Sequence, residues 1–219
     1  FLVQDEPVFA QTENARELIE YLSLFYPALE SELFYDLLSQ LKLNPKQPFS
    51  AFSKGMKRQV LMAAGLAAHP ELLLIDEVFD GLDPFARRLL QGQLAAQTVE
   101  EGMASILTSH RLSDLENFCD EYALLDEKRI LHQNSMFQTQ QELVKVHLAF
   151  DHPIDPAMFQ DFEVLKLEIH SRMAQAILRG KREAMEAKLR KQNPVILEIF
   201  DCTLEEVFLA QLEKREELQ

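Results

Sequence analysis

Apolar residues recur every three or four positions in two early segments of the chain, residues 14–26 and residues 31–43. A third such segment begins at Ser53, a residue type that favours helix N-caps, and ends near His69. The pattern predicts a helical subdomain over residues 12–69. The positions expected to face its core are Leu18, Leu22 and Phe25, then Phe34, Leu37, Leu38 and Leu41, then Met56, Val60, Ala63, Ala64 and Ala67.

Short apolar runs replace the helical pattern after residue 70. "LLLID" at 72–76 and "ASILTS" at 104–109 are typical of strands buried on both faces of a parallel sheet, and residues 84–100 between them predict a crossover helix. This alternation predicts an α/β fold. The other elements expected here are the end of a strand at residues 1–3, a short helix over 112–118, and strands at 122–126 and 129–133 that pair across a turn at Glu127 and Lys128.

The pattern changes after about residue 140. Three segments alternate apolar and polar residues with period two, as half-exposed strands do, and helical segments are expected between them. A last helix begins with a capping box, Thr203 and Glu206. We therefore expect a small α+β domain at 141–219, after a first domain at 1–140. Its strands are expected at 144–150, 162–170 and 194–200, and its last helix is expected to bury Leu204, Val207, Phe208 and Leu212.

Composition narrows the classes of partner. The 219 residues are 47% hydrophobic and 26% charged, as in globular proteins, and a net charge of −14 argues against a nucleic-acid partner. Two cysteines without metal-ligand spacing indicate buried thiols in a reducing, cytoplasmic compartment. Because no apolar run approaches the roughly 20 residues of a membrane-spanning helix, direct membrane insertion is not expected, and membrane contact would go through another subunit.

Carboxylates surround the second apolar run in "ELLLIDEVFDGLDP". Asp76 and Glu77 follow the strand directly; by themselves they fit an ordinary strand that ends in two surface acids. A magnesium ion in phosphoryl chemistry needs hard oxygen ligands, and Asp76 at the carboxyl end of a buried parallel strand is a candidate. Hydrolysis needs a polarised water, and Glu77, facing the other way, is the candidate general base.

Three further segments stand in a fixed order around this pair. "FSKGMKRQ" at 52–59 precedes it, while Asp83 in "GLDP" and His110 at a strand end follow it. Together these segments resemble the signature motif, Walker B, D-loop and switch histidine of the ATPase subunit of ATP-binding-cassette (ABC) transporters, over residues 4 to about 135. "FSKGM" and the C-terminal α+β extension look most like bacterial export-type systems.

The resemblance implies a role for each matched residue. Ser53 and Gly55 at a helix N-terminus would contact a γ-phosphate of ATP bound to a partner ATPase subunit. Two subunits, identical or different, would then enclose the ATP. The alternative is that Ser53 only caps the helix. Asp83 would help to join the two sites. His110 would contact the γ-phosphate, and Gln4 resembles the Q-loop glutamine near the metal.

One expected motif is missing: no G-x-x-x-x-G-K-[ST] occurs in these residues, so we expect the chain by itself to bind ATP weakly or not at all. That loop would lie upstream of Gln4, and truncation explains its absence better than evolutionary loss. Val78 and Phe79 also replace the usual Pro and Thr. "FSKGM" also stands in place of the commoner Leu-Ser-Gly-Gly-Gln, and none of these smaller departures removes a reacting group.

These observations predict a partial P-loop NTPase-like parallel sheet with a helical subdomain, followed by a small α+β domain. The predicted function is Mg²⁺-dependent ATP hydrolysis that drives transport through a separate membrane permease, at the inner face of the cell membrane. An inert or regulatory module is the main alternative, although it would need neither Glu77 nor His110. A non-transport, nucleic-acid-associated ATPase fits the acidic charge poorly. An effector-binding role for the C-terminal domain rests on fold analogy.

Overall fold

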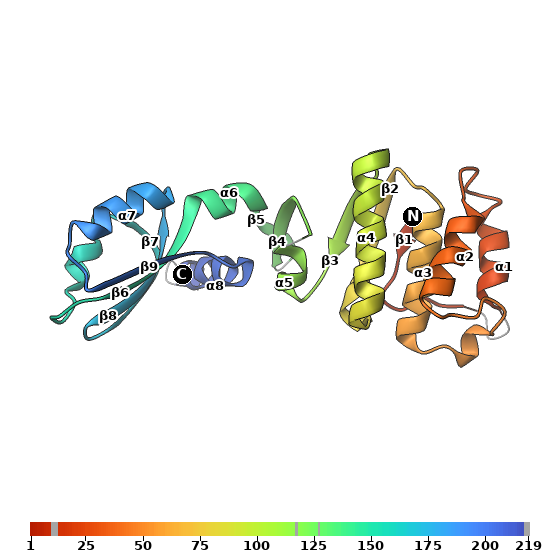
Figure 1. Ribbon diagram of the computed structural model, residues 1–219, viewed down its shortest axis with the longest axis horizontal. Helices are drawn as coiled ribbons and strands as arrows, with labels where there is room; N and C mark the ends of the chain where they lie inside the picture. Colours follow the sequence, from red (N-terminus) through yellow and green to blue (C-terminus); the bar gives the residue numbers. More distant parts are fainter. Residues whose placement is uncertain (10–12, 117, 127, 217–219) are drawn as a thin grey trace. The chain divides into compact units, whose positions relative to one another are not determined.

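The computed structural model describes residues 1–9, 13–116, 118–126 and 128–216. These residues form two compact units, Phe1–Arg111 and Leu112–Gln219. Each unit has its own sheet and its own covering helices (Figure 1). The two units are therefore described one at a time.

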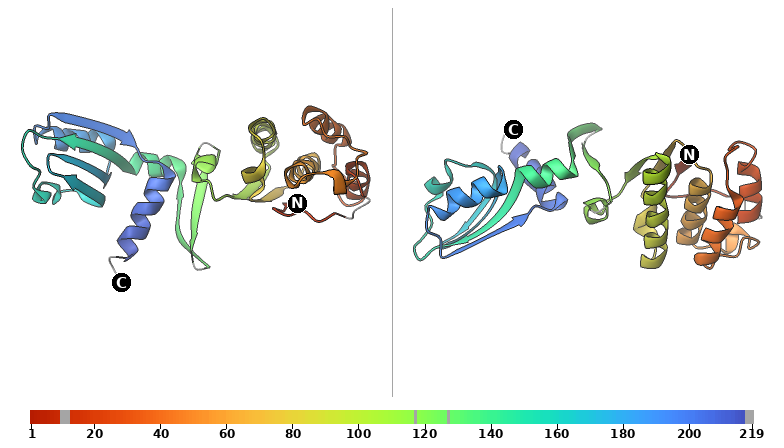
Figure 2. Two further views of the ribbon diagram at one scale, coloured as in Figure 1. Left: turned by 90° about the horizontal axis from the view of Figure 1, so that it is seen from below. Right: turned by 45° about the horizontal axis from the view of Figure 1, so that its top comes forward.

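The first unit is built on a parallel sheet of three strands in the order β1-β2-β3. The long helices α3 and α4 lie on the same side of this sheet (Figure 2). Predicted helix, strand and crossover positions are confirmed, with small changes at their ends. The elements are β1 (Leu2–Val3), α1 (Ala15–Leu22), α2 (Ser31–Gln40), η1 (Phe49–Ala51), α3 (Lys54–Ala67), β2 (Leu72–Asp76), η2 (Val78–Gly81), α4 (Pro84–Glu101) and β3 (Ala104–Thr108).

The central strand β2 is buried on one face only. Leu73 and Ile75 are 0% and 2% exposed, and Leu73 lies directly under Gly65 of α3. On the other face Leu72 and Ile106 are 41% and 60% exposed. The expectation of a sheet buried on both faces is therefore wrong for these residues, because α3 and α4 pack on a single side.

The first helix is shorter than its pattern predicts. Asn14 caps it as expected, accepting a hydrogen bond from the Glu17 amide, but α1 ends at Leu22. Phe25, which the pattern placed on the buried face, is 61% exposed. Pro27 explains the early end, because a proline and the residue before it both disfavour the helical conformation.

The second unit contains an antiparallel sheet with strand order β7-β8-β6-β9. Its connections follow the β-α-β-β-α-β arrangement of ferredoxin-like domains, with a 3₁₀ turn in place of the first helix. Helix α7 packs on the sheet face that carries Val144 and Val146. The elements are β6 (Leu143–Ala149), η3 (Pro156–Phe159), β7 (Glu163–His170), β8 (Met173–Arg179), α7 (Arg182–Arg190) and β9 (Ile196–Asp201).

Strand β8 was not predicted; only helical segments were expected between residues 170 and 194. Its buried residues Ala176, Ile177 and Leu178 are consecutive, so the period of two is lost. The strand is recognisable only by its position, because it lies in the middle of the sheet and pairs with β6 and β7. Both of its faces are covered there.

The same unit includes residues 112–140, which the sequence pattern assigns to the first domain. The predicted hairpin of β4 and β5 is confirmed; Glu127 in its turn lies outside the described residues. Tyr122 and Leu124 of β4 share a core with Leu204 of α8, which explains why the structure divides after Arg111. The remaining elements are α5 (Leu112–Glu116), β4 (Glu121–Asp126), β5 (Arg129–Ser135), α6 (Met136–Glu142) and α8 (Leu204–Glu216).

The capping box of α8 is confirmed. The Thr203 amide donates to Glu206 Oε2 at 3.0 Å, and the Glu206 amide donates to Thr203 Oγ1 at 3.2 Å. Leu204 and Val207 are buried and Phe208 packs on the same core, as expected; the Leu212 side chain lies outside the described residues. Glu206 Oε1 also pairs with Lys145 Nζ of β6 at 2.5 Å. Burial by itself would raise the pKa of Glu206, but the hydrogen bonds from Lys145 and Thr203 outweigh it and lower the pKa.

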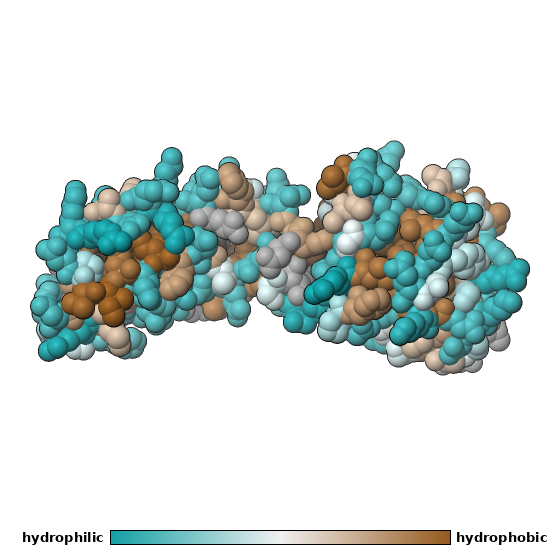
Figure 3. Space-filling model, in the orientation of Figure 1, coloured by the Kyte–Doolittle hydropathy of each residue, from teal (hydrophilic) through white to brown (hydrophobic). Residues whose placement is uncertain are grey.

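Within the described part of the chain, no helix combines the length and the apolar content that crossing a lipid bilayer would require. On the face shown in Figure 3, hydrophilic residues cover most of the surface, and hydrophobic residues show between them on both units.

We predict that Glu206→Gln destabilises the second unit in a pH-dependent way. Because the pKa of Glu206 is lower in the folded state, its carboxylate stabilises the fold at neutral pH, and this contribution is lost as the pH falls through that lowered pKa. Urea unfolding should show a deficit of about 1 kcal/mol at neutral pH, and the deficit should shrink in strongly acidic buffer as the carboxylate is protonated. A deficit equal at both pH values would contradict the assignment.

Candidate functional site

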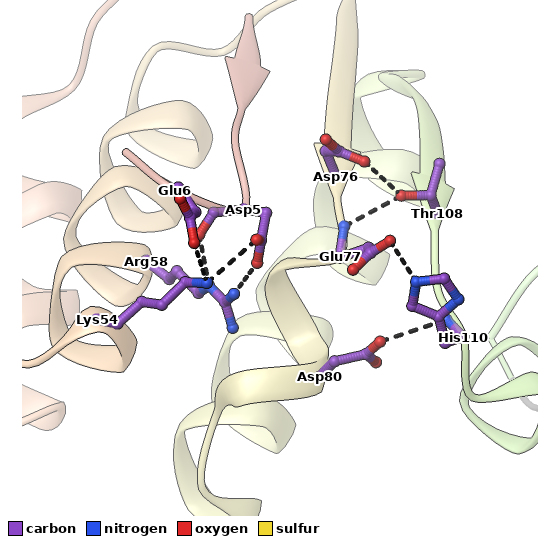
Figure 4. Close-up of polar contacts among 9 residues, drawn as sticks. All are labelled: Asp5, Glu6, Lys54, Arg58, Asp76, Glu77, Asp80, Thr108 and His110. Carbon is purple, nitrogen blue, oxygen red and sulfur yellow. Dashed lines mark hydrogen bonds and ion pairs between the residues drawn. The ribbon is translucent and has the colours of Figure 1, made fainter. Parts of the chain in front are cut away.

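Strand register brings the predicted site residues to one edge of the parallel sheet. Val3 pairs with Ile75, and Asp76 pairs with Thr108, so Gln4 and Asp76 leave the sheet at the same edge. The Thr108 hydroxyl donates to Asp76 Oδ1 at 2.8 Å and accepts from the Glu77 amide at 3.1 Å (Figure 4). One side chain of β3 thus orients both acids at the end of β2.

Glu77 and His110 meet beside this edge. Glu77 has a left-handed backbone with φ of 52°, which is unusual for a residue other than glycine. Its Oε1 lies 2.7 Å from His110 Nε2 (Figure 4). The imidazole is 80% exposed and the Glu77 side chain is 35% exposed, so both groups can reach solvent. Such strained conformations persist mainly where the surrounding structure requires them, and they concentrate at functional sites.

Asp80 is a site residue that the sequence reasoning missed. Its Oδ1 accepts a hydrogen bond from Ser109 Oγ at 2.9 Å, and its Oδ2 accepts from the His110 amide at 3.3 Å. The Ser109 hydroxyl in turn accepts from the Arg111 amide at 2.9 Å. Asp80 therefore holds the segment that carries His110. Only the 3₁₀ turn of η2, which no sequence pattern predicted, places it there.

Arg58 fastens η2 and the segment after β1 to helix α3. Its Nε donates to the Asp5 carbonyl at 2.7 Å, and its guanidinium forms an ion pair with the Asp5 carboxylate (Figure 4). The guanidinium is nearly buried and lies so close to Gly81 that a Cβ there would overlap it. Lys54 of α3 adds an ion pair with Glu6 at 2.8 Å, and it lowers the pKa of that carboxyl. These contacts link α3 to Asp5 and Glu6 on one side and to η2 on the other.

Ser53 and Gly55 open α3, as predicted, and both have structural roles within this chain. Ser53 Oγ accepts a hydrogen bond from the Met56 amide at 3.1 Å, so it caps the helix. A Cβ on Gly55 would lie 3.0 Å from the Gly81 carbonyl oxygen, which leaves little room for any larger residue. The contact of Ser53 and Gly55 with a γ-phosphate on a partner subunit stays a prediction.

Asp83 is the N-cap of α4. Its Oδ1 accepts hydrogen bonds from the Phe85 and Ala86 amides, both at 3.0 Å. Its Oδ2 accepts from Gln59 Nε2 of α3 at 3.3 Å. Both carboxylate oxygens thus accept hydrogen bonds within the chain, and the part of Asp83 in joining a second site stays a prediction.

The described residues contain no group of three or more His, Cys, Asp or Glu side chains arranged to hold a metal ion. This arrangement still fits magnesium, because Mg²⁺ is usually held by one or two carboxylates together with phosphate oxygens and water. Asp76 uses Oδ1 to accept from Thr108, while the side chain stays exposed at the sheet edge. Gln4 is also exposed at this edge.

Comparison with known proteins finds ATP-binding proteins of ABC transporters among the relatives, although no family model matches the chain. ABC transporter ATP-binding protein YtrB of Bacillus subtilis is 24% identical over 196 residues, which cover 90% of this chain and 67% of the relative. Nod factor export ATP-binding protein I of Ralstonia nicotianae is 32% identical over 130 residues, 58% of this chain and 40% of the relative. A solved ATP-binding subunit of an ABC transporter matches with a TM-score of 0.57 and 25% identity, over 64% of this chain and 60% of that one.

The relatives of this chain are ABC transporter ATP-binding proteins, and its fold is part of an ABC ATPase fold. The predicted resemblance and fold class are therefore confirmed. The chain spans about two thirds of YtrB and less than half of the Nod factor export protein.

We predict that Asp80→Ala releases the segment around His110. Without the carboxylate, Ser109 Oγ and the His110 amide lose their acceptor, so the His110 amide should exchange with solvent about tenfold faster. Amide hydrogen exchange followed by NMR measures this. Asp36→Ala, at an exposed site on α2, is the matched control and should leave the exchange unchanged. Equal His110 exchange in wild type and Asp80→Ala would show that Asp80 does not hold this segment.

Proposed function

We propose that this chain is the catalytic half of an ABC ATPase, which hydrolyses ATP with Mg²⁺ to drive transport through a separate membrane permease. The observation that carries the proposal is the single cluster of Asp76, Glu77 and His110, oriented by Thr108 and Asp80. The names of the relatives, as ATP-binding proteins of transporters, support the same reaction class.

Each residue of the cluster has a defined task in this proposal. Glu77 takes the proton from an attacking water, because its carboxylate is exposed and is oriented by His110 at 2.7 Å. His110 donates a hydrogen bond toward the terminal phosphate. Asp76, with Gln4 nearby, would hold Mg²⁺, which supplies charge neutralisation on the phosphate oxygens. Thr108 orients the Asp76 carboxylate and the Glu77 backbone through its hydroxyl group.

Assembly is a further part of the proposal. Ser53 and Gly55 lie at the N-terminus of the 14-residue helix α3, where amide groups and the helix dipole favour an anion. A second ATPase subunit, identical or different, would present its nucleotide to this end. The exposed apolar face of Leu72 and Ile106 supports further packing of an ATPase core against the sheet. Work at the cytoplasmic face of a membrane would follow from binding to the permease.

We predict that Glu77→Gln, in a complete ATPase that carries this chain and a phosphate-binding loop, lowers ATP turnover by about 100-fold or more. The amide keeps the shape of the side chain but cannot accept the proton, so ATP-bound dimers should accumulate. The rate of phosphate release measures ATP hydrolysis, and size-exclusion chromatography with ATP measures the amount of dimer. Glu100→Gln, at an exposed site near the end of α4, is the control and should retain wild-type turnover. Undiminished hydrolysis in Glu77→Gln would refute the role of Glu77 as the base.

These 219 residues by themselves should show no saturable thermal shift with ATP at micromolar concentration. They lack the glycine-rich loop and lysine that supply most contacts to the β- and γ-phosphates. Differential scanning fluorimetry across an ATP titration, with and without Mg²⁺, tests this. A saturable rise in melting temperature at micromolar ATP would mean that the nucleotide is bound by residues other than those assigned.

A further inference from the structure

A pocket of about 130 Å³ lies on the sheet of the second unit, at the point where helix α8 begins to cover it. It is on the face opposite to α7. The side chains that carry the argument are Lys145 of β6, Lys166 and Glu168 of β7, Ile177 of β8, and Glu206 and Leu209 of α8. No residue of the candidate ATPase site contributes to this pocket.

Strand register sets the spacing of the two lysines. Lys145 and Lys166 are both cross-strand partners of Ile177, which places the three residues in one row across β6, β8 and β7. Neighbouring strands lie about 4.8 Å apart, so the two lysine backbones are about 10 Å apart with an apolar side chain between them. The ammonium groups therefore flank Ile177 on the same face of the sheet.

Each lysine is accompanied by a carboxylate. Lys145 Nζ lies 2.5 Å from Glu206 Oε1, and Lys166 Nζ lies 3.2 Å from Glu168 Oε1. The charged groups of the pocket therefore sum to zero, with two positive and two negative. The ion pairs are partly exposed to solvent, and such pairs contribute little to stability, so a ligand can rearrange them at small cost.

Size and polarity restrict the ligand. A cavity of about 150 Å³ accepts a molecule as large as benzene, whereas pockets for larger ligands exceed about 300 Å³. A nucleotide is therefore too large. Because these charges cancel, the pocket offers no net attraction to a simple anion or to a simple cation. A small molecule with both charges and an apolar group matches all of the lining residues.

We propose that this pocket binds a small apolar α-amino acid. Its carboxylate lies between Lys145 and Lys166, and its ammonium group contacts Glu168 and Glu206. Its side chain packs on Ile177 and Leu209. This site is independent of the ATPase function proposed above.

Isothermal titration calorimetry of the full chain with L-alanine, L-valine and L-leucine tests the proposal. At least one amino acid should bind saturably, with a dissociation constant of about 1 mM or lower. For L-valine, isovalerate lacks the ammonium group and isobutylamine lacks the carboxylate; each should bind at least about tenfold more weakly than L-valine, because each leaves one pair of protein charges without a partner. Absence of binding by all three amino acids, or equal binding of either analogue, would overturn the proposal.

Variants locate the binding. Lys166→Met should weaken the binding of the amino acid with the highest affinity at least about tenfold. Glu168→Gln should also weaken this binding, and it should reduce the difference in affinity between the amino acid and the analogue that lacks the ammonium group. Lys191→Met, at the exposed C-cap of α7 on the other side of the sheet, is the matched control and should bind as the wild type does. Proton–nitrogen NMR spectra check that each variant is folded and should show ligand shifts at the Gln175 and Ile177 amides. Unchanged affinity in a folded Lys166→Met variant would place the binding elsewhere.

Discussion

The parallel pairing of β2 with β3 is the constraint on which the candidate site depends. Asp76 is aligned with Thr108 by this register, and the Thr108 hydroxyl bonds both to Asp76 and to the Glu77 amide. A shift of one residue would turn Thr108 to the other face and leave both acids without this partner. Ser109 and His110 directly follow Thr108, so the same register places them beside the end of β2. Two segments more than thirty residues apart in the chain, one with Asp76 and Glu77 and the other with His110, therefore form one cluster.

Rigidity of the loop after Glu77 is the second requirement. Glu77 has a left-handed backbone, which costs about 1–2 kcal/mol relative to ordinary conformations. Several contacts on η2 and its flanks offset this cost: Arg58 packs against Gly81, Asp80 binds Ser109 and His110, and Asp83 caps α4. Arg58 also holds the Asp5 backbone, so a movement of the segment after β1 would be felt at η2 and at the start of α3.

The second unit follows different rules. Its sheet is antiparallel, one face is covered by α7, and α8 covers only part of the other. Polar side chains therefore remain on the uncovered part of that face, and the strand register arranges Lys145 and Lys166 symmetrically about Ile177. Glu206 belongs both to the capping box of α8 and to this charged group, so the start of the helix and the pocket are held by the same residue.

The sequence by itself determined the elements whose patterns are local. Helices α2, α3 and α4, the strands β2 and β3, the caps at Asn14 and Ser53, and the capping box at Thr203 were all predictable, because helix periodicity and capping depend on neighbours within a few residues. The ordered motifs also identified Asp76, Glu77 and His110 as candidates. Only the tertiary structure decided the strand β8 and the grouping of the β4–β5 hairpin with α8, since these depend on packing between distant residues. For the same reason Asp80, Thr108 and Arg58 carry no local signal: each acts through a partner about 30 residues or more away in the chain.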